Sequence, residues 1–232
     1  MDLWFGDSWP IGNELGPMDA KYDAEIFPNA CGGDNPLKAF STLVSTHRKQ
    51  QFINFAKNAA SIDFALYQLT LFCNSRKDLL NQPNTPLTAF LCTTAQIRGY
   101  GFDHILDKHV HYFNERRKSI TPIYDSIVAI NAFYTLCKMH NIKCIIIPIF
   151  CDIMIPTNLE QIVLFGDALL TKTSLVELAF NEKFIDDKLY EQNVPENTIY
   201  EILASKDWIT PNRMHPNIIG HRKLAYKLIE LL

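Results

Sequence analysis

Two short motifs at opposite ends of the chain contain residues that together could perform nucleophilic catalysis. Ser8 ends the motif Gly-Asp-Ser, which directly follows a short apolar run, and His215 opens the motif His-Pro-Asn-Ile-Ile-Gly-His. A serine hydroxyl is a poor nucleophile until a neighbouring base takes its proton, and histidine is the usual base near neutral pH. The pair predicts a serine nucleophile with a histidine base, provided that the fold brings the two ends of the chain together.

Each motif alone also has an ordinary structural explanation. Gly, Asp and Ser all favour turns, so the first motif could be a turn and nothing more. His215 could simply cap or pack against the helix that Pro216 begins, because proline suits the first turn of a helix. His221 lies further along that helix and is expected to face a neighbouring element. The catalytic interpretation therefore depends on both motifs meeting at one site.

The alternation of apolar runs with helical periodicity predicts an α/β sheet that could bring the two motifs together. Short apolar runs typical of strands occupy residues 2–6, 51–56, 87–93 and 143–150. Apolar residues recur at helical spacing over residues 37–48, 61–72, 120–137 and 216–232. The helical pattern at 120–137 leads into the run at 143–150, which is apolar and β-branched. Such a run is typical of a strand that is covered on both faces.

Two stretches, around residues 98–118 and 152–212, do not follow this pattern and are predicted to be loop insertions. In open α/β sheets such segments usually lie over the carboxyl ends of the strands, where ligands bind. No internal repeat or convincing linker interrupts the sequence. We therefore expect a single domain over residues 1–232.

Composition excludes several other classes of protein. The chain has 232 residues, with 22 Lys and Arg against 25 Asp and Glu and a formal net charge of −3. This balance argues against a nucleic-acid partner, which would require a basic excess. No apolar run approaches the roughly 18 residues that a membrane span needs. The N-terminal residues lack the features of a secretion leader, and the six cysteines lack zinc spacing, so a reduced, cytoplasmic setting with core thiols is expected.

The two end motifs resemble those of the SGNH hydrolases, also called the GDSL esterase and lipase family. Members place the nucleophile in an N-terminal Gly-Asp-Ser block and the base in a C-terminal His-Pro-Asn-x-x-Gly-His block, and both blocks match here. The resemblance implies a three-layer α/β/α, flavodoxin-like fold with a central, mainly parallel sheet. It also implies that Ser8 attacks an ester carbonyl to form an acyl-enzyme and that His215 moves the proton.

The family's two middle blocks match less well. The resemblance implies an oxyanion held by the backbone N–H of Ser8, a glycine N–H from the second block and an asparagine side chain from the third. Where the second block should follow the strand at 51–56, the chain has no glycine, and the N–H of Ala60 is the candidate donor. Where the third block should follow the next strand, Thr94 or Gln96 is the candidate donor.

The acid that usually orients the base is also replaced. Family members have Asp three residues before the histidine, whereas this chain has Asn212. In a serine protease triad, Asp→Asn costs about 10⁴-fold in kcat because the imidazole takes the wrong tautomer. Three explanations remain open: a Ser–His dyad oriented by a backbone carbonyl, an acid supplied by Asp207, or an impaired enzyme.

Trp9 and Arg98 are candidate substrate-binding residues. Trp9 follows the nucleophile and could line a pocket for an acyl group or a sugar, or could simply pack the loops. Arg98 follows the third predicted strand and could bind an anionic substrate group or form a surface salt bridge. The His-rich run of residues 103–111 has no zinc-binding spacing, so neither a metal nor a cofactor is expected.

The sequence therefore predicts a serine esterase that cleaves an O-acyl or O-acetyl ester of a small molecule or a glycan. A non-catalytic binding or structural module on a degenerate hydrolase scaffold is the first alternative, because the middle blocks and the acid differ. An acyltransferase that uses the same two residues is the second.

Overall fold

The computed structural model describes most of the chain. The described residues are 1–12, 15, 25–30, 35–58, 60–80, 86–93, 98–103, 108–113, 121–149, 152–153, 155–180, 208 and 215–232. For residues 8, 98–103, 108–113, 121 and 122, the description covers the backbone alone.

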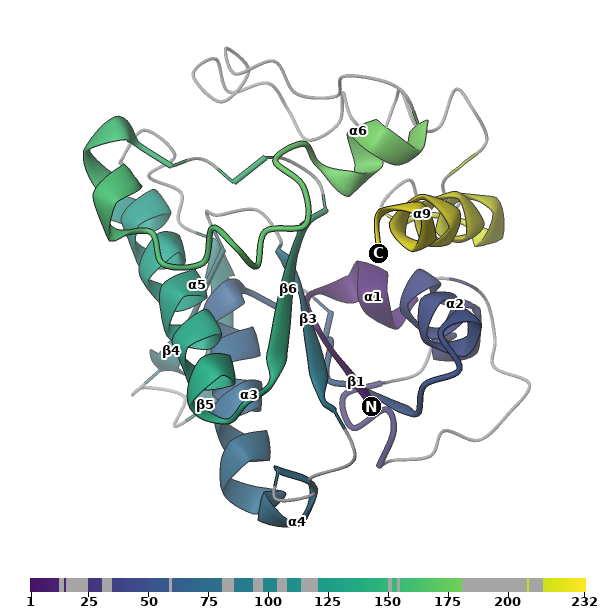
Figure 1. Ribbon diagram of the computed structural model, residues 1–232, viewed down its shortest axis with the longest axis horizontal. Coiled ribbons are helices and arrows are strands. Elements are labelled where there is room, and N and C mark those ends of the chain that lie inside the picture. The colour runs from purple at the N-terminus through teal and green to yellow at the C-terminus, as the bar shows by residue number, and fades with distance from the viewer. Residues whose placement is uncertain are drawn as a thin grey trace.

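Four parallel strands form the central sheet in the order β2-β1-β3-β6 (Figure 1). These strands are β1 (Asp2–Phe5), β2 (Phe52–Asn54), β3 (Thr88–Thr93) and β6 (Lys143–Pro148). Leu169 forms a parallel bridge with Ile146 and so adds a fifth position beyond β6. This is the strand order of flavodoxin-like folds, in which ligands bind at the carboxyl ends where the order reverses.

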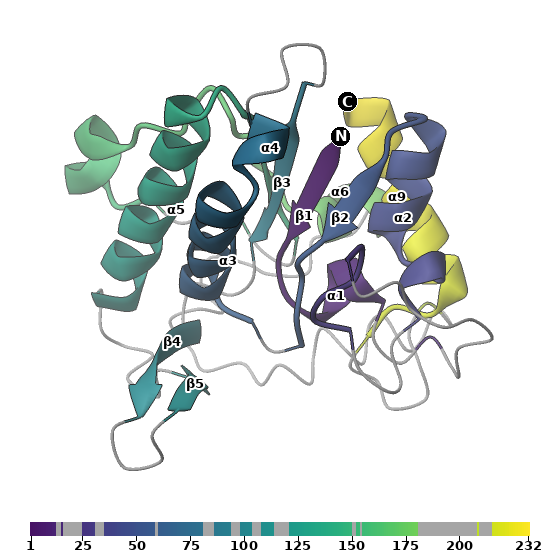
Figure 2. The same cartoon turned by 90° about the horizontal axis from the view of Figure 1, so that it is seen from below.

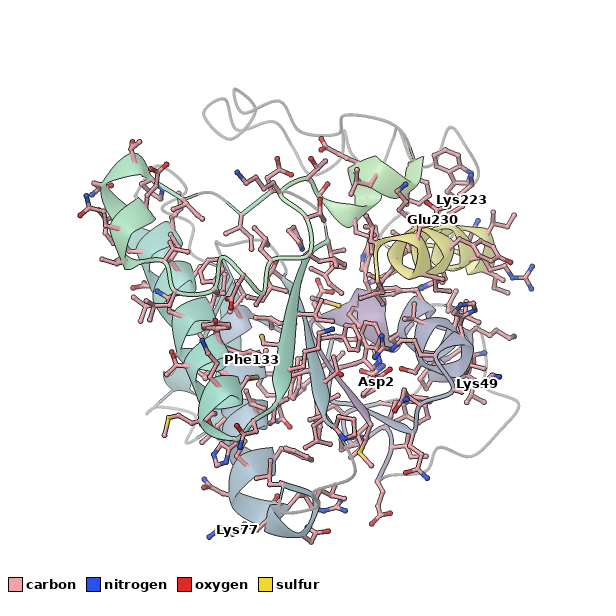
Figure 3. The ribbon with its side chains drawn as sticks, viewed as in Figure 1. Asp2, Lys49, Lys77, Phe133, Lys223 and Glu230 are labelled. Atoms are coloured by element: carbon pink, nitrogen blue, oxygen red, sulfur yellow. The ribbon has the colours of Figure 1, made fainter. Side chains whose placement is uncertain are left out.

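Helices cover both faces of the sheet and complete three layers. Figures 1 and 2 show α3 (Ile62–Ser75) and α5 (Thr121–Met139) on one face, and α2 (Phe40–His47) and α9 (Ile218–Leu231) on the other. Phe133 of α5 lies against the sheet (Figure 3), with its ring edge-on to Phe5 at a centroid distance of 5.1 Å. On the opposite face, the rings of Trp4 and Phe90 stack 4.2 Å apart. The predicted three-layer α/β/α fold with a mainly parallel sheet is confirmed.

The remaining elements are short. They are α1 (Ser8–Ile11), the 3₁₀ helices η1 (Pro36–Lys38) and η2 (Thr157–Ile162), α4 (Lys77–Leu80), the hairpin strands β4 (Arg98–Asp103) and β5 (Lys108–Phe113), and α6 (Leu175–Phe180). The strands β4 and β5 pair antiparallel in a sheet of their own, which lies below α3 in Figure 2. The described part of the 98–118 stretch is thus a separate hairpin.

Part of the second predicted insertion is hydrogen-bonded to α5. Asn131 of α5 donates from Nδ2 to the carbonyl of Ile162 at 2.9 Å and accepts from the N–H of Leu164 at 2.8 Å. Tyr134, also in α5, donates from its hydroxyl to Asp167. Polar side chains of α5 thus hold residues 162–167 of this stretch, whereas Val176 further along donates its N–H to the carbonyl of Ile149, just beyond the end of β6.

Most of the described cysteines are buried, as core thiols would be. Cys73, Cys92 and Cys137 are buried free thiols and Cys144 is partly buried, whereas Cys31 and Cys151 lie outside the described residues. Burial raises the pKa of the Cys73 thiol to about 11, so this group stays protonated. In the described part of the chain, none of the helices has the length and apolar character needed to cross a membrane.

Candidate active site

Ser8 follows β1, the strand from which the chain first adds β2 on one side and then β3 on the other. It is the first residue of α1, three residues beyond the end of β1. From β1 the chain passes through α2 on one face to β2, and it then returns through α3 on the other face to β3. In open α/β sheets, ligands bind outside the carboxyl ends of the strands at such a switch point, which here lies between β1 and β3.

Gly6 and Asp7 are explained by the turn that leads to Ser8. Gly6 has a φ of +152°, and a Cβ there would lie 2.9 Å from both Cβ and the carbonyl oxygen of Cys92. A side chain at this position would therefore strain the backbone and collide with β3. The Asp7 carboxylate is buried and accepts the N–H of Trp9 at 3.1 Å, closing a local turn. The turn explanation thus accounts for Gly6 and Asp7, and the turn carries Ser8 past the end of the sheet.

Buried hydrogen bonds fasten α1 to its neighbours at the carbonyl of Pro10. Ser41 of α2 donates from Oγ to this carbonyl at 2.5 Å, and Asn54 at the end of β2 donates from Nδ2 at 2.8 Å. Asn54 also donates to Ser41 Oγ at 3.1 Å and accepts the N–H of Ala56 at 3.0 Å. Both side chains are fully buried. Sequence reasoning missed Ser41 and Asn54; a polar residue inside the apolar run at 51–56 was the available signal.

The second motif builds the start of α9. Asn217 is the N-cap of the helix, and its Oδ1 accepts the N–H of Gly220 at 3.0 Å. A Cβ at Gly220 would lie 2.4 Å from the carbonyl oxygen of Trp208, which itself accepts the N–H of Asn217 at 2.9 Å. Gly220 therefore allows residue 208 to approach the helix, and these motif residues have structural roles. His215 precedes the helix and is 9 % exposed.

His221 is a fully buried neighbour of His215. Its Nδ1 accepts the N–H of Phe40 at 3.1 Å, and the two rings stack with centroids 5.9 Å apart. Burial, together with the charge of a protonated His215, lowers the pKa of His221 to about 3. Because Nδ1 accepts a hydrogen bond, the single proton of this neutral imidazole is on Nε2.

The two motifs therefore meet on the first turn of α2. Phe40 donates to His221 of the second motif, and the next residue, Ser41, donates to Pro10 in the short helix α1 that begins with Ser8. Figure 2 shows α1 and the beginning of α9 at the same edge of the molecule, beyond the carboxyl end of β1. The fold thus brings together two segments that are about 200 residues apart in the chain.

All the predicted site residues, Ser8 and His215 included, stay predictions. The N–H of Ala60 donates to the carbonyl of Lys57 at 3.0 Å, so an oxyanion would have to displace or share this bond. Trp9 is 2 % exposed and belongs to the core cluster between the sheet and α9, which agrees with its packing explanation. Arg98 begins β4, with only its backbone described.

Several predicted residues lie outside the described part of the chain. They are Thr94, Gln96, Asp207 and Asn212. Within the described residues, no three His, Cys, Asp or Glu side chains gather in a way that could hold a metal ion.

No protein-family model and no curated protein sequence matches this chain. Among solved structures, it is similar to the acetyl xylan esterase Est2A of the rumen bacterium Butyrivibrio proteoclasticus, with a TM-score of 0.52 and 10 % sequence identity. That match covers 99 % of this chain and 62 % of the esterase. It is a similarity of fold.

Two further matches have lower TM-scores. The psychrotrophic esterase EstA from Pseudoalteromonas sp. has a TM-score of 0.48 at 10 % identity, covering 99 % of this chain and 94 % of that one. A member of the lipolytic G-D-S-L family from Veillonella parvula has a TM-score of 0.44 at 16 % identity, covering 99 % and 96 %. What is confirmed is the fold that the resemblance implied, three layers around a mainly parallel sheet. A fold by itself does not establish an activity.

Proposed function

We propose that this chain is a serine esterase that cleaves an O-acyl or O-acetyl ester through an acyl-enzyme, with Ser8 as nucleophile and His215 as base. The observation that carries the proposal is the position of Ser8 directly beyond β1, where the strand order reverses. The base motif starts α9 at the same edge (Figure 2). The fold match to an acetyl xylan esterase supports an acetyl group on a carbohydrate as the first substrate to test.

The proposed reaction has two proton transfers in each half. Ser8 Oγ attacks the ester carbonyl carbon while His215 accepts the hydroxyl proton. The tetrahedral intermediate then expels the alcohol, which leaves with the proton from His215. Water attacks the acyl-enzyme with His215 again acting as base, and the acid product leaves as Ser8 regains its proton. The Ser8 N–H is the first proposed donor to the oxyanion in both halves.

The surroundings of His215 suit a base that must hold a proton briefly. His221 is close enough for the charge of a protonated His215 to lower its pKa, yet it does not compete for the proton. Its Nδ1 is engaged by the N–H of Phe40, and its Nε2 already carries hydrogen. Asp207 stays the proposed orienting acid, because its chain neighbour Trp208 is fastened to Asn217, two residues after His215.

The experiment compares the wild type with Ser8→Ala, using a fluorophosphonate probe and p-nitrophenyl acetate. Ser8→Ala should abolish labelling and lower kcat/KM by about 10⁴-fold or more, because no other group supplies the nucleophile. Ser75→Ala, an exposed serine at the end of α3, is the control and should label as the wild type does. Labelling and turnover that persist in Ser8→Ala would refute the proposed nucleophile.

A non-catalytic binding module is the second candidate function. The engaged N–H of Ala60 and the Asn at position 212 favour it, since both weaken the machinery that the family uses. Calorimetric binding of an acetylated xylo-oligosaccharide, without release of acetate and without probe labelling, would support this candidate over the esterase.

A further inference from the structure

We propose that Ser41 and Asn54 are positioning residues, which set the place of Ser8 relative to His215 through the first turn of α2. The inference rests on the proposed function and adds two residues to its site. Neither belongs to the two end motifs, and neither is expected to touch the substrate.

The nucleophile side depends on a single carbonyl group. Pro10 lies two residues after Ser8 in a helix of four residues, so its carbonyl has little chance of a partner within that helix. Ser41 Oγ and Asn54 Nδ2 both donate to it, from α2 and from β2. A buried carbonyl with two donors has a strongly preferred orientation, and the short helix that holds Ser8 is oriented with it.

The base side depends on the residue next to Ser41. The N-cap of α2 is Ala39, which has no side-chain oxygen to accept the orphan N–H groups of the first turn. His221 Nδ1 accepts the N–H of Phe40 in place of a cap. The start of α9 is thereby fixed against the same turn of α2 that holds α1.

The Ser41–Pro10 and Phe40–His221 hydrogen bonds together connect the helix that begins with Ser8 to the helix that follows His215. The first turn of α2 therefore fixes the positions of the two relative to each other. A proton passes from Ser8 to His215 only when the two side chains are within hydrogen-bond reach. A displacement of about 1 Å in an active site can cost about 100-fold in rate. Loss of the Ser41 bond should therefore lower kcat, whereas KM should change little because Ser41 is not expected to touch the ester.

The chain contains a matched control for Ser41 in the same helix. Ser45 lies one turn further along α2 and is also fully buried. Its Oγ donates to Asp2 at 3.0 Å and accepts from Trp4 Nε1 at 2.8 Å, at the amino end of β1. Ser45→Ala thus removes a comparable buried hydroxyl, but far from the proposed reaction.

The test measures kcat and KM for p-nitrophenyl acetate together with urea stability, in wild type, Ser41→Ala and Ser45→Ala. We expect Ser41→Ala to lower kcat about 10- to 100-fold with KM within about twofold. Ser45→Ala should lose at least as much stability and keep kcat within about twofold. Ser41→Cys retains the side-chain shape with a weaker donor, so it should fold and give an intermediate kcat.

Three outcomes would overturn the inference. Equal kcat in Ser41→Ala and wild type would show that Ser41 does not position Ser8. Equal losses of kcat in Ser41→Ala and Ser45→Ala would show a general effect of stability. Wild-type protein without Ser8-dependent turnover would refute the esterase itself and the positioning role with it, a result distinct from the other two.

Discussion

The two ends of β1 both have buried polar groups around them, and α2 supplies a serine to each. At the amino end, the Asp2 carboxylate accepts from Ser45 and from the guanidinium of Arg48. Figure 3 shows Asp2 inside the molecule beside α2. At the carboxyl end, Ser41 and Asn54 bind a backbone carbonyl instead of a charge.

The difference lies in what each group of hydrogen bonds leaves for chemistry. At the amino end, Ser45 and Arg48 both bind the buried Asp2 carboxylate and compensate its charge. The bonds at the carboxyl end hold α1, the short helix whose first residue is the proposed nucleophile. We infer that the amino end of β1 mainly serves stability, whereas the carboxyl end serves both stability and geometry. Variants at the two ends should therefore separate stability from activity.

The largest expected effect on stability comes from the amino end. Arg48→Met keeps the side-chain stem over the Phe90 ring but leaves the fully buried Asp2 carboxylate without its guanidinium. Breaking one side of such a pair costs about 3 kcal/mol, since the remaining charge is poorly compensated. Urea unfolding at neutral pH should show this loss, while kcat per folded molecule stays at the wild-type value.

Two observations would contradict that division. A fall in kcat of Arg48→Met under conditions where the protein is fully folded would mean that the amino end contributes to the site. An unchanged free energy of unfolding in Arg48→Met would mean that the buried pair does not stabilise the amino end.

The elements of this frame could be predicted where burial leaves a pattern in the sequence. The apolar runs at 51–56, 87–93 and 143–150 match β2, β3 and β6, because strands covered on both faces are apolar throughout. The hairpin of β4 and β5 was missed, since it pairs outside the central sheet and contains Gly99 and Gly101 in one strand.

The candidate site could be predicted only in part. The two end motifs predict Ser8 and His215 as the reacting pair. The reasons for Gly6 and Gly220, however, lie in β3 and at Trp208, which no local pattern indicates. Ser41 and Asn54 act through hydrogen bonds to Pro10, 31 and 44 residues away in the chain. Single polar residues with such distant partners have no periodic signal.

The next effect in size is the pH dependence of stability that His221 confers at the carboxyl end. Its pKa falls from the ordinary histidine value near 6.5 to about 3 in the folded state. Below about pH 6.5, His221 is protonated in the unfolded chain but stays neutral in the folded protein. The free energy of unfolding is therefore at its full value above about pH 6.5 and declines as pH falls towards 3. Each pH unit inside this window should remove up to about 1.4 kcal/mol.

His221→Asn tests this dependence, because asparagine Oδ1 can accept the N–H of Phe40 without titrating. Urea unfolding at pH 7 and at pH 4.5 should show a smaller loss on acidification for His221→Asn than for the wild type. The exposed His47, replaced in the same way, is the control and should leave the wild-type loss unchanged. Equal acid sensitivity of His221→Asn and wild type would refute the role of His221.

The smallest expected effect on stability comes from the N-cap residues of α3 and α9, two helices that begin at the carboxyl edge. Ser61 Oγ accepts the N–H of Phe64 at the start of α3, and Asn217 Oδ1 accepts the N–H of Gly220 at the start of α9. Replacing either by alanine should cost about 1 kcal/mol, the usual worth of an N-cap. Only Asn217→Ala should also lower kcat, because Asn217 holds the turn that follows His215. A parallel fall in kcat for Ser61→Ala would instead bring the second block into the site, since Ser61 follows Ala60 and its loss would disturb that N–H.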